Sequence, residues 1–443
     1  MSRKIAIVGA TIEGFMQLAL LVRNRRVYRE YADDEYILIH DPDKVYNFQL
    51  ATPGVAFFET LEREIHITKR WMKQYTDEIE GCGFKYIGWG NKHNFFLSGC
   101  NHTFDINKFR DEFIKDGGQI FGPNVQIVEK RIDSFEADED KCLINGDKYD
   151  YVVDCTQKEP LGWETDYQSP SVEFSNSAII VEKPVASTWN YTIEYAAKHG
   201  HIVGIPLKNK QVWSYFYHDD YSTIDEVKED FETILPGEDL TNNITWNPRV
   251  SNYVIHPDNK RYFKNGNALI NIDLSVVFGA EYTEYLGYQI ADYIFGQGDK
   301  EQIETVTQSQ YIEYILRTLQ SYVCFLHQYG SIHQSKYWEM AQFKSCEYLE
   351  SAIFHHPNVF PGHKWRNEMI TDEWDDEELK MAHHRHLLYE DEWTRKEDKL
   401  PYMWMTNSTL FYDLAIGLDA PYADKLKTMG NTIPSEEFGV LNV

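Results

Sequence analysis

The first residues of the chain predict a strand, a tight turn and a helix. Lys4 to Val22 read KIAIVGATIEGFMQLALLV, where an apolar run ends at Gly9 and apolar residues recur at helical spacing after Gly14. In such a unit, backbone amides and the positive end of the helix meet at one point, which suits a pyrophosphate. A second apolar run begins at Tyr36 and ends two residues before Asp41, whose carboxylate is placed to accept hydrogen bonds from a ribose. The sequence therefore predicts a dinucleotide-binding βαβ unit. Its expected contacts are Gly9, Ala10, Thr11, Gly14 and Asp41.

The turn departs from the dinucleotide pattern GxGxxG at its second glycine. Thr11 stands at that position, and its Cβ and methyl group reach into space where backbone and phosphate approach closely. Two interpretations stay open from the turn alone. It is either a nucleotide site with a weakened phosphate contact or an ordinary βαβ turn.

Composition places the chain among globular proteins and disfavours several partners. The 443 residues are 42% hydrophobic and 26% charged, enough for one large core or two. The net charge of -27 repels nucleic acid and anionic membrane surfaces. The six cysteines show no CxxC spacing, and no run of 18 or more apolar residues follows the N-terminus. We therefore expect a cytoplasmic protein with reduced thiols, without a membrane span and without nucleic acid as a partner.

The order of the remaining segments predicts an α/β fold. Strands are expected near 82–89, 125–129, 141–144 and 149–154, with a hairpin at Asn145-Gly146, and β structure dominates 178–217. Helices are expected over 57–75, 104–115 and 223–231 and from about Glu281. From Gln302 the periodicity is helical. We predict a core over 1–300, with an inserted sheet at about 165–260, followed by a mostly helical region over 301–443.

Five segments carry patterns beyond this general outline. They are GATIEGF (9–15), FKYIGW (84–89), HIVGIPL (201–207), EYTEYLG (281–287) and FLHQYGSIHQSKYW (325–338). In this order they resemble the flavin-dependent halogenases of the tryptophan-halogenase type. That family has GGGTAGW at the first place, and its signature Trp-x-Trp-x-Ile-Pro-Leu is matched at the third with His201 and Val203 in place of the tryptophans. The resemblance covers roughly the whole chain.

The resemblance implies a glutathione-reductase-like FAD-binding fold with a β-sheet substrate layer. Residues 1–300 would form the FAD-binding and halogenation core, and 301–443 the helical substrate-binding region. Lys85 falls on the catalytic lysine of the family and Glu284 on its catalytic glutamate. Further expected flavin contacts are Ala51, Thr52, Ile205 and Pro206, and the expected halide contacts are Leu286 and Gly287.

The reaction that the resemblance implies uses FADH2 from a separate flavin reductase, together with oxygen and a halide ion: chloride, bromide or iodide. Hypohalous acid would pass through a tunnel to Lys85, whose ammonium polarises it or whose amine forms a haloamine. Glu284 would orient the oxidant or take the proton that the arene loses. Small electron-rich aromatic substrates such as indoles and phenols are expected. A homo-oligomer stays open.

Two other functions also stay open from the sequence. A flavin-dependent monooxygenase would hydroxylate an aromatic substrate without using Lys85. A non-catalytic relative would keep the FAD fold as a binding or assembly module, as the altered turn at Thr11 allows. The histidines at 355, 356, 383, 384 and 386 lack a spaced Cys or carboxylate pattern, so no metal site is expected.

Overall fold

A computed structural model gives the fold of the chain. It describes residues 2–28, 31–45, 61–62, 67–90, 94–115, 121–138, 141–162, 167–272, 279–296, 330–355 and 432–434, with a few single positions between 316 and 327. The expected contacts Ala51 and Thr52 and most of the expected helical region lie outside the described residues.

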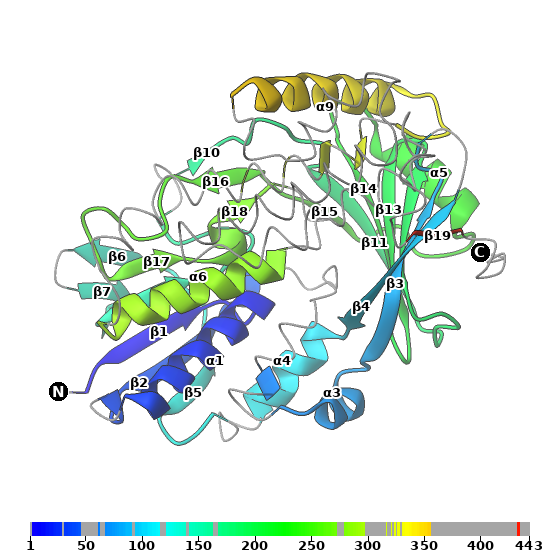
Figure 1. Cartoon of the computed structure of the whole chain (residues 1–443). Coiled ribbons are helices and arrows are strands. Elements are labelled where there is room, and N and C mark those ends of the chain that lie inside the picture. The colour runs from blue at the N-terminus through cyan, green and yellow to red at the C-terminus, as the bar shows by residue number, and fades with distance from the viewer. Residues whose placement is uncertain are drawn as a thin grey trace, which may run out of the picture.

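A five-stranded parallel sheet forms one part of the described structure. In order across the sheet its strands are β17 (Tyr262–Lys264), β9 (Tyr151–Asp154), β1 (Lys4–Val8), β2 (Glu35–His40) and β5 (Val125–Glu129). All neighbouring strands run parallel. Helices α1 (Ile12–Val27) and α6 (Gly279–Ile294) lie side by side next to this sheet (Figure 1). Because both faces are covered, the central strands are apolar except at their ends.

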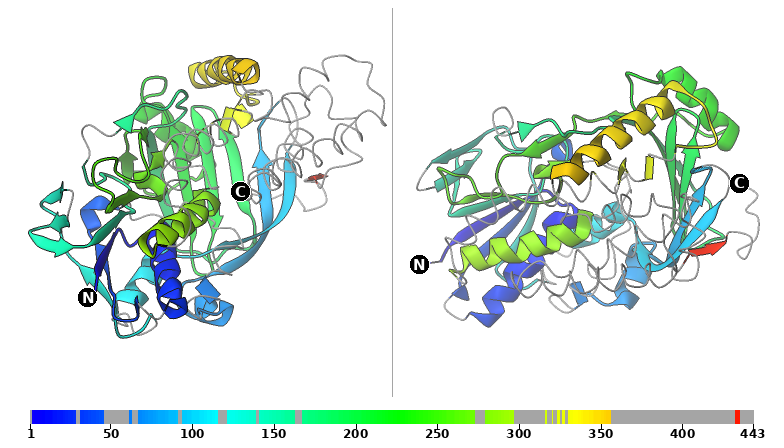
Figure 2. Two further views of the ribbon diagram at one scale, coloured as in Figure 1. Left: turned by 60° about the vertical axis from the view of Figure 1, so that its left-hand side comes forward. Right: turned by 45° about the horizontal axis from the view of Figure 1, so that its top comes forward.

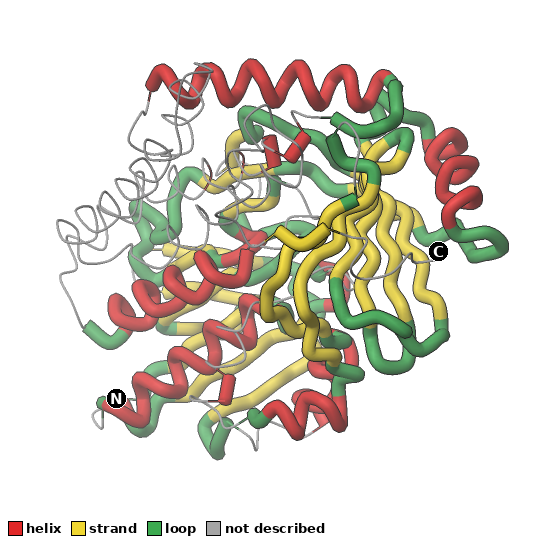
Figure 3. The backbone as a smooth tube through the Cα atoms, turned by 45° about the vertical axis from the view of Figure 1, so that its right-hand side comes forward, coloured by secondary structure: helices red, strands yellow, loops and turns green. Residues whose placement is uncertain are grey.

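An eight-stranded sheet forms the second part, and Figure 3 shows its strands running beside one another. Its order is β15 (Asn243–Thr245), β11 (Ser177–Lys183), β14 (Gln211–Tyr217), β13 (Gly200–Pro206), β12 (Thr192–Ala197), β3 (Ile79–Ile87), β4 (Phe95–Thr103) and β19 (Thr432–Pro434). All of its pairs are antiparallel except that of β3 with β12. Helix α5 (Ile224–Ile234) packs on one face through Val227 and Phe231. Helix α9 (Lys336–His355) packs on residues of the other face through Tyr337 and Trp338.

Smaller elements join and flank these sheets. Helices α3 (Lys69–Tyr75) and α4 (Ile106–Lys115) enclose the β3–β4 pair along the chain. Figure 2 shows α9 above the large sheet, away from α1. The other elements are the 3-10 helices η2 (Pro42–Lys44) and η3 (Gly266–Ala268), the strands β6 (Phe135–Asp138), β7 (Lys141–Ile144) and β8 (Asp147–Tyr149), and the strands β10 (Tyr167–Gln168), β16 (Arg249–Ser251) and β18 (Ile270–Asn271).

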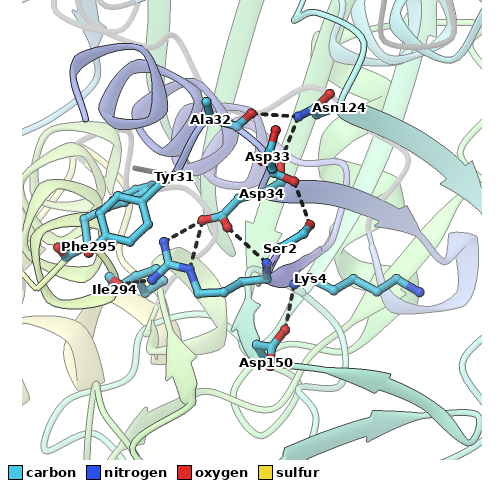
Figure 4. Close-up of polar contacts among 11 residues, drawn as sticks. Ser2, Lys4, Tyr31, Ala32, Asp33, Asp34, Asn124, Asp150, Ile294 and Phe295 are labelled. Carbon is cyan, nitrogen blue, oxygen red and sulfur yellow. Dashed lines mark hydrogen bonds and ion pairs between the residues drawn. The ribbon is translucent and has the colours of Figure 1, made fainter. Parts of the chain in front are cut away.

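Polar contacts fasten the N-terminal end of the chain at the amino ends of β1 and β2 (Figure 4). The guanidinium of Arg3 donates from Nε to the Asp34 carboxylate over 2.9 Å and from Nη1 to the Ile294 carbonyl over 2.7 Å. The backbone N–H of Lys4 donates to Asp150 over 2.7 Å. Since Ile294 ends α6, these bonds hold that helix to the edge of the sheet opposite the β1–α1 turn.

The structure confirms the α/β fold and several local predictions. Asn145 and Gly146 both have positive φ, 51° and 82°, as a two-residue hairpin turn requires. Thr223 caps α5 in a reciprocal capping box with Glu226. The sheet expected at about 165–260 contains β11 to β15, and it extends beyond that range because β3, β4 and β19 join it.

Among the described residues, no helix is long and apolar enough to cross a membrane.

Candidate functional site

Two glycines close the β1–α1 turn. Gly9 has a φ of +107°, and a Cβ added there would lie 2.5 Å from the carbonyl oxygen of Cys155. A Cβ on Gly14 would lie 1.9 Å from the carbonyl oxygen of Gly9. Neither position has room for a side chain, so β1, α1 and the end of β9 approach closely here. The turn has the tight backbone path that a nucleotide phosphate requires.

Thr11 caps the helix that begins at this turn. Its hydroxyl donates to the Cys155 carbonyl over 3.2 Å and accepts from the N–H of Gly14 over 3.1 Å. The residue is 3% exposed. The threonine therefore occupies one of the first N–H groups of α1 and fixes the turn to β9. Ala10, next to it, is buried in the apolar core.

Glu13 lies at the start of α1, and no role was predicted for it from the sequence. A Cβ added to Gly266 of η3 would lie 2.2 Å from Cγ of Glu13 and 3.0 Å from its Cδ, so the glutamate side chain lies directly against that glycine. Its Oε2 is buried and has no hydrogen-bond partner among the residues that the structure describes. Burial raises the pKa of Glu13, although its own backbone N–H and Thr11 act in the opposite direction. The signal in the sequence was a single charge within the apolar stretch 5–22.

Both carboxylate oxygens of Asp41 accept hydrogen bonds from backbone N–H groups of the protein. Its Oδ1 accepts from the N–H of Asp43 over 2.9 Å and its Oδ2 from the N–H of Ile132 over 2.8 Å. The residue is 1% exposed. Asp41 thus caps η2 and holds the segment between β5 and β6, and its role toward a ribose stays a prediction.

His40, the last residue of β2, presents an unused polar atom at the same edge of the sheet. It is 3% exposed, and its Nδ1 has no hydrogen-bond partner in the described part of the chain. Burial, followed by the charge of Arg110, lowers the pKa of His40 to about 4, so the ring is neutral near pH 7. Arg110 is itself 8% exposed and comes from α4. The sequence analysis did not single out Arg110 because it reads as one position of an amphipathic helix.

The fit of this edge to FAD depends on backbone and side chains separately. The glycine turn and the neutral, unpartnered His40 suit a nucleotide, since its phosphates need close backbone approach and its ribose offers hydroxyl groups. Glu13 does not suit it, because a carboxylate beside a phosphate repels it. The backbone fits a dinucleotide, and one side chain disagrees with it.

Helix α6 carries Glu284 and the two expected halide contacts. Glu284 is half-buried, while Leu286 is buried in the core. A Cβ on Gly287 would lie 2.6 Å from the Leu20 side chain of α1. Leu286 and Gly287 lie within a continuous helix, where N–H groups donate to carbonyls of the same helix. The halide assignment stays a prediction.

A buried amide network joins α1, η3 and α6 behind this edge. Asn265 donates to Gln17 over 3.0 Å and to the Thr283 carbonyl over 3.1 Å. Gln17 donates to the Gly287 carbonyl over 3.2 Å. These bonds fix the start of α6 beside α1, so Glu284 has a defined place near the nucleotide turn.

Lys85 lies in the other part of the structure. It pairs with Phe96 of β4 on one side and with Ile193 of β12 on the other. Ile193 in turn pairs with Gly204 of β13, and Gly204 pairs with Trp213 of β14. Paired residues share a face, so Lys85 lies on the face that α5 covers. Lys85 is 3% exposed, and burial lowers the pKa of its ammonium. No hydrogen bond or ion pair joins this ammonium to any residue that the structure describes. Lys85 and Glu284 thus belong to different layers.

Ile205 and Pro206 end β13 in the large sheet. Ile205 is buried, and the Pro206 carbonyl accepts from the Thr103 hydroxyl over 2.7 Å. Their expected contact with a flavin stays a prediction. No group of three or more His, Cys, Asp or Glu residues that could hold a metal ion occurs in the described part of the chain.

An aromatic cluster fills the interior between the large sheet and α9. The His327 ring stacks on the rings of Phe174 and Trp338, with distances between ring centroids of 4.3 Å and 5.6 Å. His201, which replaces a tryptophan of the family signature, lies 5.6 Å from His327 and 5.8 Å from Trp89. The sequence analysis missed this cluster because its members come from segments far apart in the chain.

Comparisons with known proteins agree with this architecture. The fold defines an α/β protein with a Rossmann-like parallel sheet, and it matches solved structures of flavin-dependent halogenases. A tryptophan halogenase from Shewanella frigidimarina matches with a TM-score of 0.65 and 15% identity, covering 97% of this chain and 98% of that one. MibH, a lathipeptide tryptophan 5-halogenase, matches at 0.66 and 14%, with coverages of 96% and 94%. The apo structure of VirX1 matches at 0.68 and 13%, with coverages of 97% and 98%.

These likenesses establish the fold, and at 13% to 15% identity they do not by themselves establish an activity. No protein-family model and no curated protein sequence matches the chain.

Proposed function

We propose that this protein is a flavin-dependent halogenase that acts on small, electron-rich aromatic substrates. When bound, reduced FAD would supply the electrons with which oxygen oxidises a halide ion to hypohalous acid. A separate flavin reductase would supply the FADH2. Similarity in fold over 96–97% of the chain to halogenases that act on tryptophan supports this class of reaction.

The observation that carries the proposal within the chain is Lys85, a buried lysine whose ammonium has no ion pair or hydrogen bond among the residues that the structure describes. Burial of most of the Lys85 side chain lowers the pKa of its ammonium, and such burial is costly where no partner compensates the charge. Perturbed ionisable groups of this kind cluster at functional sites. Lys85 would hold hypohalous acid through its N–H donors or bind the halogen as a haloamine.

We also propose roles for three residues of α6: Glu284, Leu286 and Gly287. Glu284 would orient the oxidant or accept the proton from the arene. Its position on α6, which packs against α1, supports a place in the same site as the cofactor. Leu286 and Gly287 would flank the halide.

Mass spectrometry of reaction products tests the proposal. The mixtures contain the protein, FAD, a flavin reductase, NADH, oxygen, one halide at a time and a panel of indoles and phenols. We expect a halide-dependent mass shift that disappears in Lys85→Met, whose side chain has similar length without charge. Lys73→Met is the matched control, because Lys73 is a half-exposed lysine on α3, and it should retain the product.

Each other outcome has a defined meaning. A product that gains one oxygen atom without halide, and persists in Lys85→Met, replaces halogenation with monooxygenation. Halogenated product in Lys85→Met at the wild-type rate removes Lys85 from the mechanism.

A second candidate is a non-catalytic module that keeps the fold as a binding surface. The Glu13 carboxyl at the nucleotide turn and the internal use of both Asp41 oxygens favour it. Failure of the folded protein to bind FAD at millimolar concentration would support this candidate over the halogenase.

A further inference from the structure

The start of α1 carries its own negative group. Glu13 is the second residue of this helix, and its side chain extends to Gly266 of η3, with the distances given above. Acidic groups in the first turn are stabilised by the helix dipole, as a ligand phosphate would be. Cys155, which directly follows β9, lies close to this group. Burial makes the largest contribution to the raised pKa of the Cys155 thiol, and the charges of Asp154 and Glu13 raise it further.

The neighbouring strand supplies a second, independent sign of a ligand. The N–H of Gly9 donates to the Ile39 carbonyl over 2.8 Å, so the turn adjoins the end of β2. His40 is the next residue of β2 and is 3% exposed. Its Nδ1 has no hydrogen-bond partner among the described residues. A molecule that reaches from the α1 N-terminus to His40 would give this nitrogen a partner, and a nucleotide has that extent and hydroxyl groups at that end.

We propose that the Glu13 carboxyl occupies the position of a nucleotide phosphate at the α1 N-terminus, and that FAD binding must displace it. This inference rests on the proposed flavin site. Glu13 then limits the affinity for FAD, because bound pyrophosphate meets both a filled space and a like charge. The protein would hold FAD weakly and exchange it readily, which suits a chain that receives FADH2 from a separate reductase.

Binding measurements on the purified full chain test this inference without any turnover. Titration calorimetry is performed with FAD, ADP and adenosine on the wild type, Glu13→Gln and Glu13→Ala. Glu13→Gln removes the charge at nearly constant shape, and Glu13→Ala also empties the space. Glu35→Gln is the matched control, since Glu35 is exposed at the opposite end of β2. Thermal unfolding verifies that each variant is folded.

We expect Glu13→Gln to bind FAD and ADP about tenfold more tightly than the wild type, and Glu13→Ala to gain at least as much. Adenosine, which lacks phosphates, should show no gain, and Glu35→Gln should equal the wild type. Equal FAD affinity in wild type and Glu13→Gln overturns the inference and leaves the proposed function standing.

The remaining outcomes separate the two proposals further. Binding of FAD by Glu13→Gln alone upholds the inference but removes flavin chemistry from the wild type. Absence of binding in every folded variant overturns both.

Discussion

The hydroxyl of Thr11 donates a hydrogen bond to the carbonyl of Cys155, 3.2 Å away, and so joins the first turn of the chain to a strand that ends more than 140 residues later. The same oxygen accepts from the N–H of Gly14. A residue that departs from the dinucleotide pattern is therefore a structural bridge between β9 and α1.

Two substitutions of Thr11 should distinguish the contribution of its hydroxyl to stability from that of its methyl group. Thr11→Ala loses the helix cap and the bond to Cys155, so the free energy of unfolding should fall by about 1 kcal/mol or more. Thr11→Ser keeps the hydroxyl and should lose less than half as much. Urea denaturation at neutral pH measures both variants. Equal losses in both would contradict a role for the hydroxyl.

Gly9→Ala should be among the most destabilising alanine substitutions at glycine. The new Cβ would lie 2.5 Å from the Cys155 oxygen at a φ of +107°, so backbone must move, and we expect a loss of about 3 kcal/mol or more. Gly146→Ala is the control. Its φ is +82° but nothing lies within 4 Å of the added Cβ, so strain alone should cost about 1 kcal/mol. Denaturation midpoints that fall by similar amounts would refute the close approach at Gly9.

Lys85→Met should stabilise the protein while it removes the proposed chemistry. Since the ammonium of this buried lysine has no partner among the described residues, its exchange for a thioether should raise the free energy of unfolding by about 1 kcal/mol. Lys73→Met, at a half-exposed position, should change it by less than about 0.5 kcal/mol. Chemical denaturation measures both. A marked destabilisation by Lys85→Met would mean that the ammonium has a partner that holds it.

Stability should fall as the pH drops from about 6.5 to about 4. Burial lowers the pKa of His327 to about 4, whereas an unfolded histidine titrates near 6.5. In this window the unfolded chain binds the proton that the folded chain excludes, so folding weakens by up to about 3 kcal/mol for this residue. Above pH 6.5 both states are neutral and the effect vanishes.

His327→Gln isolates that contribution. The variant loses stacking on Phe174 and is expected to be less stable at pH 7.5. Its free energy of unfolding should nevertheless depend less steeply on pH between 6.5 and 4. His40, with a pKa also lowered to about 4, and His201 keep part of the slope. A slope equal to that of the wild type would show that His327 protonates freely in the folded protein.

Local patterns predicted the parts of the fold whose partners are near in sequence. The β1–α1 turn, the Asn145-Gly146 hairpin and the helix expected over 223–231 depend on residues within a few positions of one another, and all are present. The overall fold was predicted from the order of the segments that resemble the halogenase family, because their order and spacing involve the whole chain.

Contacts between distant segments could not be predicted in this way. Nothing near Asp41 in the sequence indicates that Ile132 takes one of its oxygens, and nothing near Glu13 indicates that Gly266 makes room for it. The face on which Lys85 lies depends on its pairing with Ile193, more than 100 residues later. Short motifs can therefore suggest site residues, but the surroundings of those residues come from segments far away in the sequence.

The parallel pairing of β3 with β12 sets an order of events during synthesis. When β3 and β4 leave the ribosome they can pair with each other, but one long edge of β3 stays open until Thr192–Ala197 has been made. By then β1, β2, β5 and β9 have all been synthesised. The nascent chain thus carries four of the five strands of the parallel sheet, all except β17, beside an exposed hairpin edge. A chaperone that shields strand edges would act on this interval.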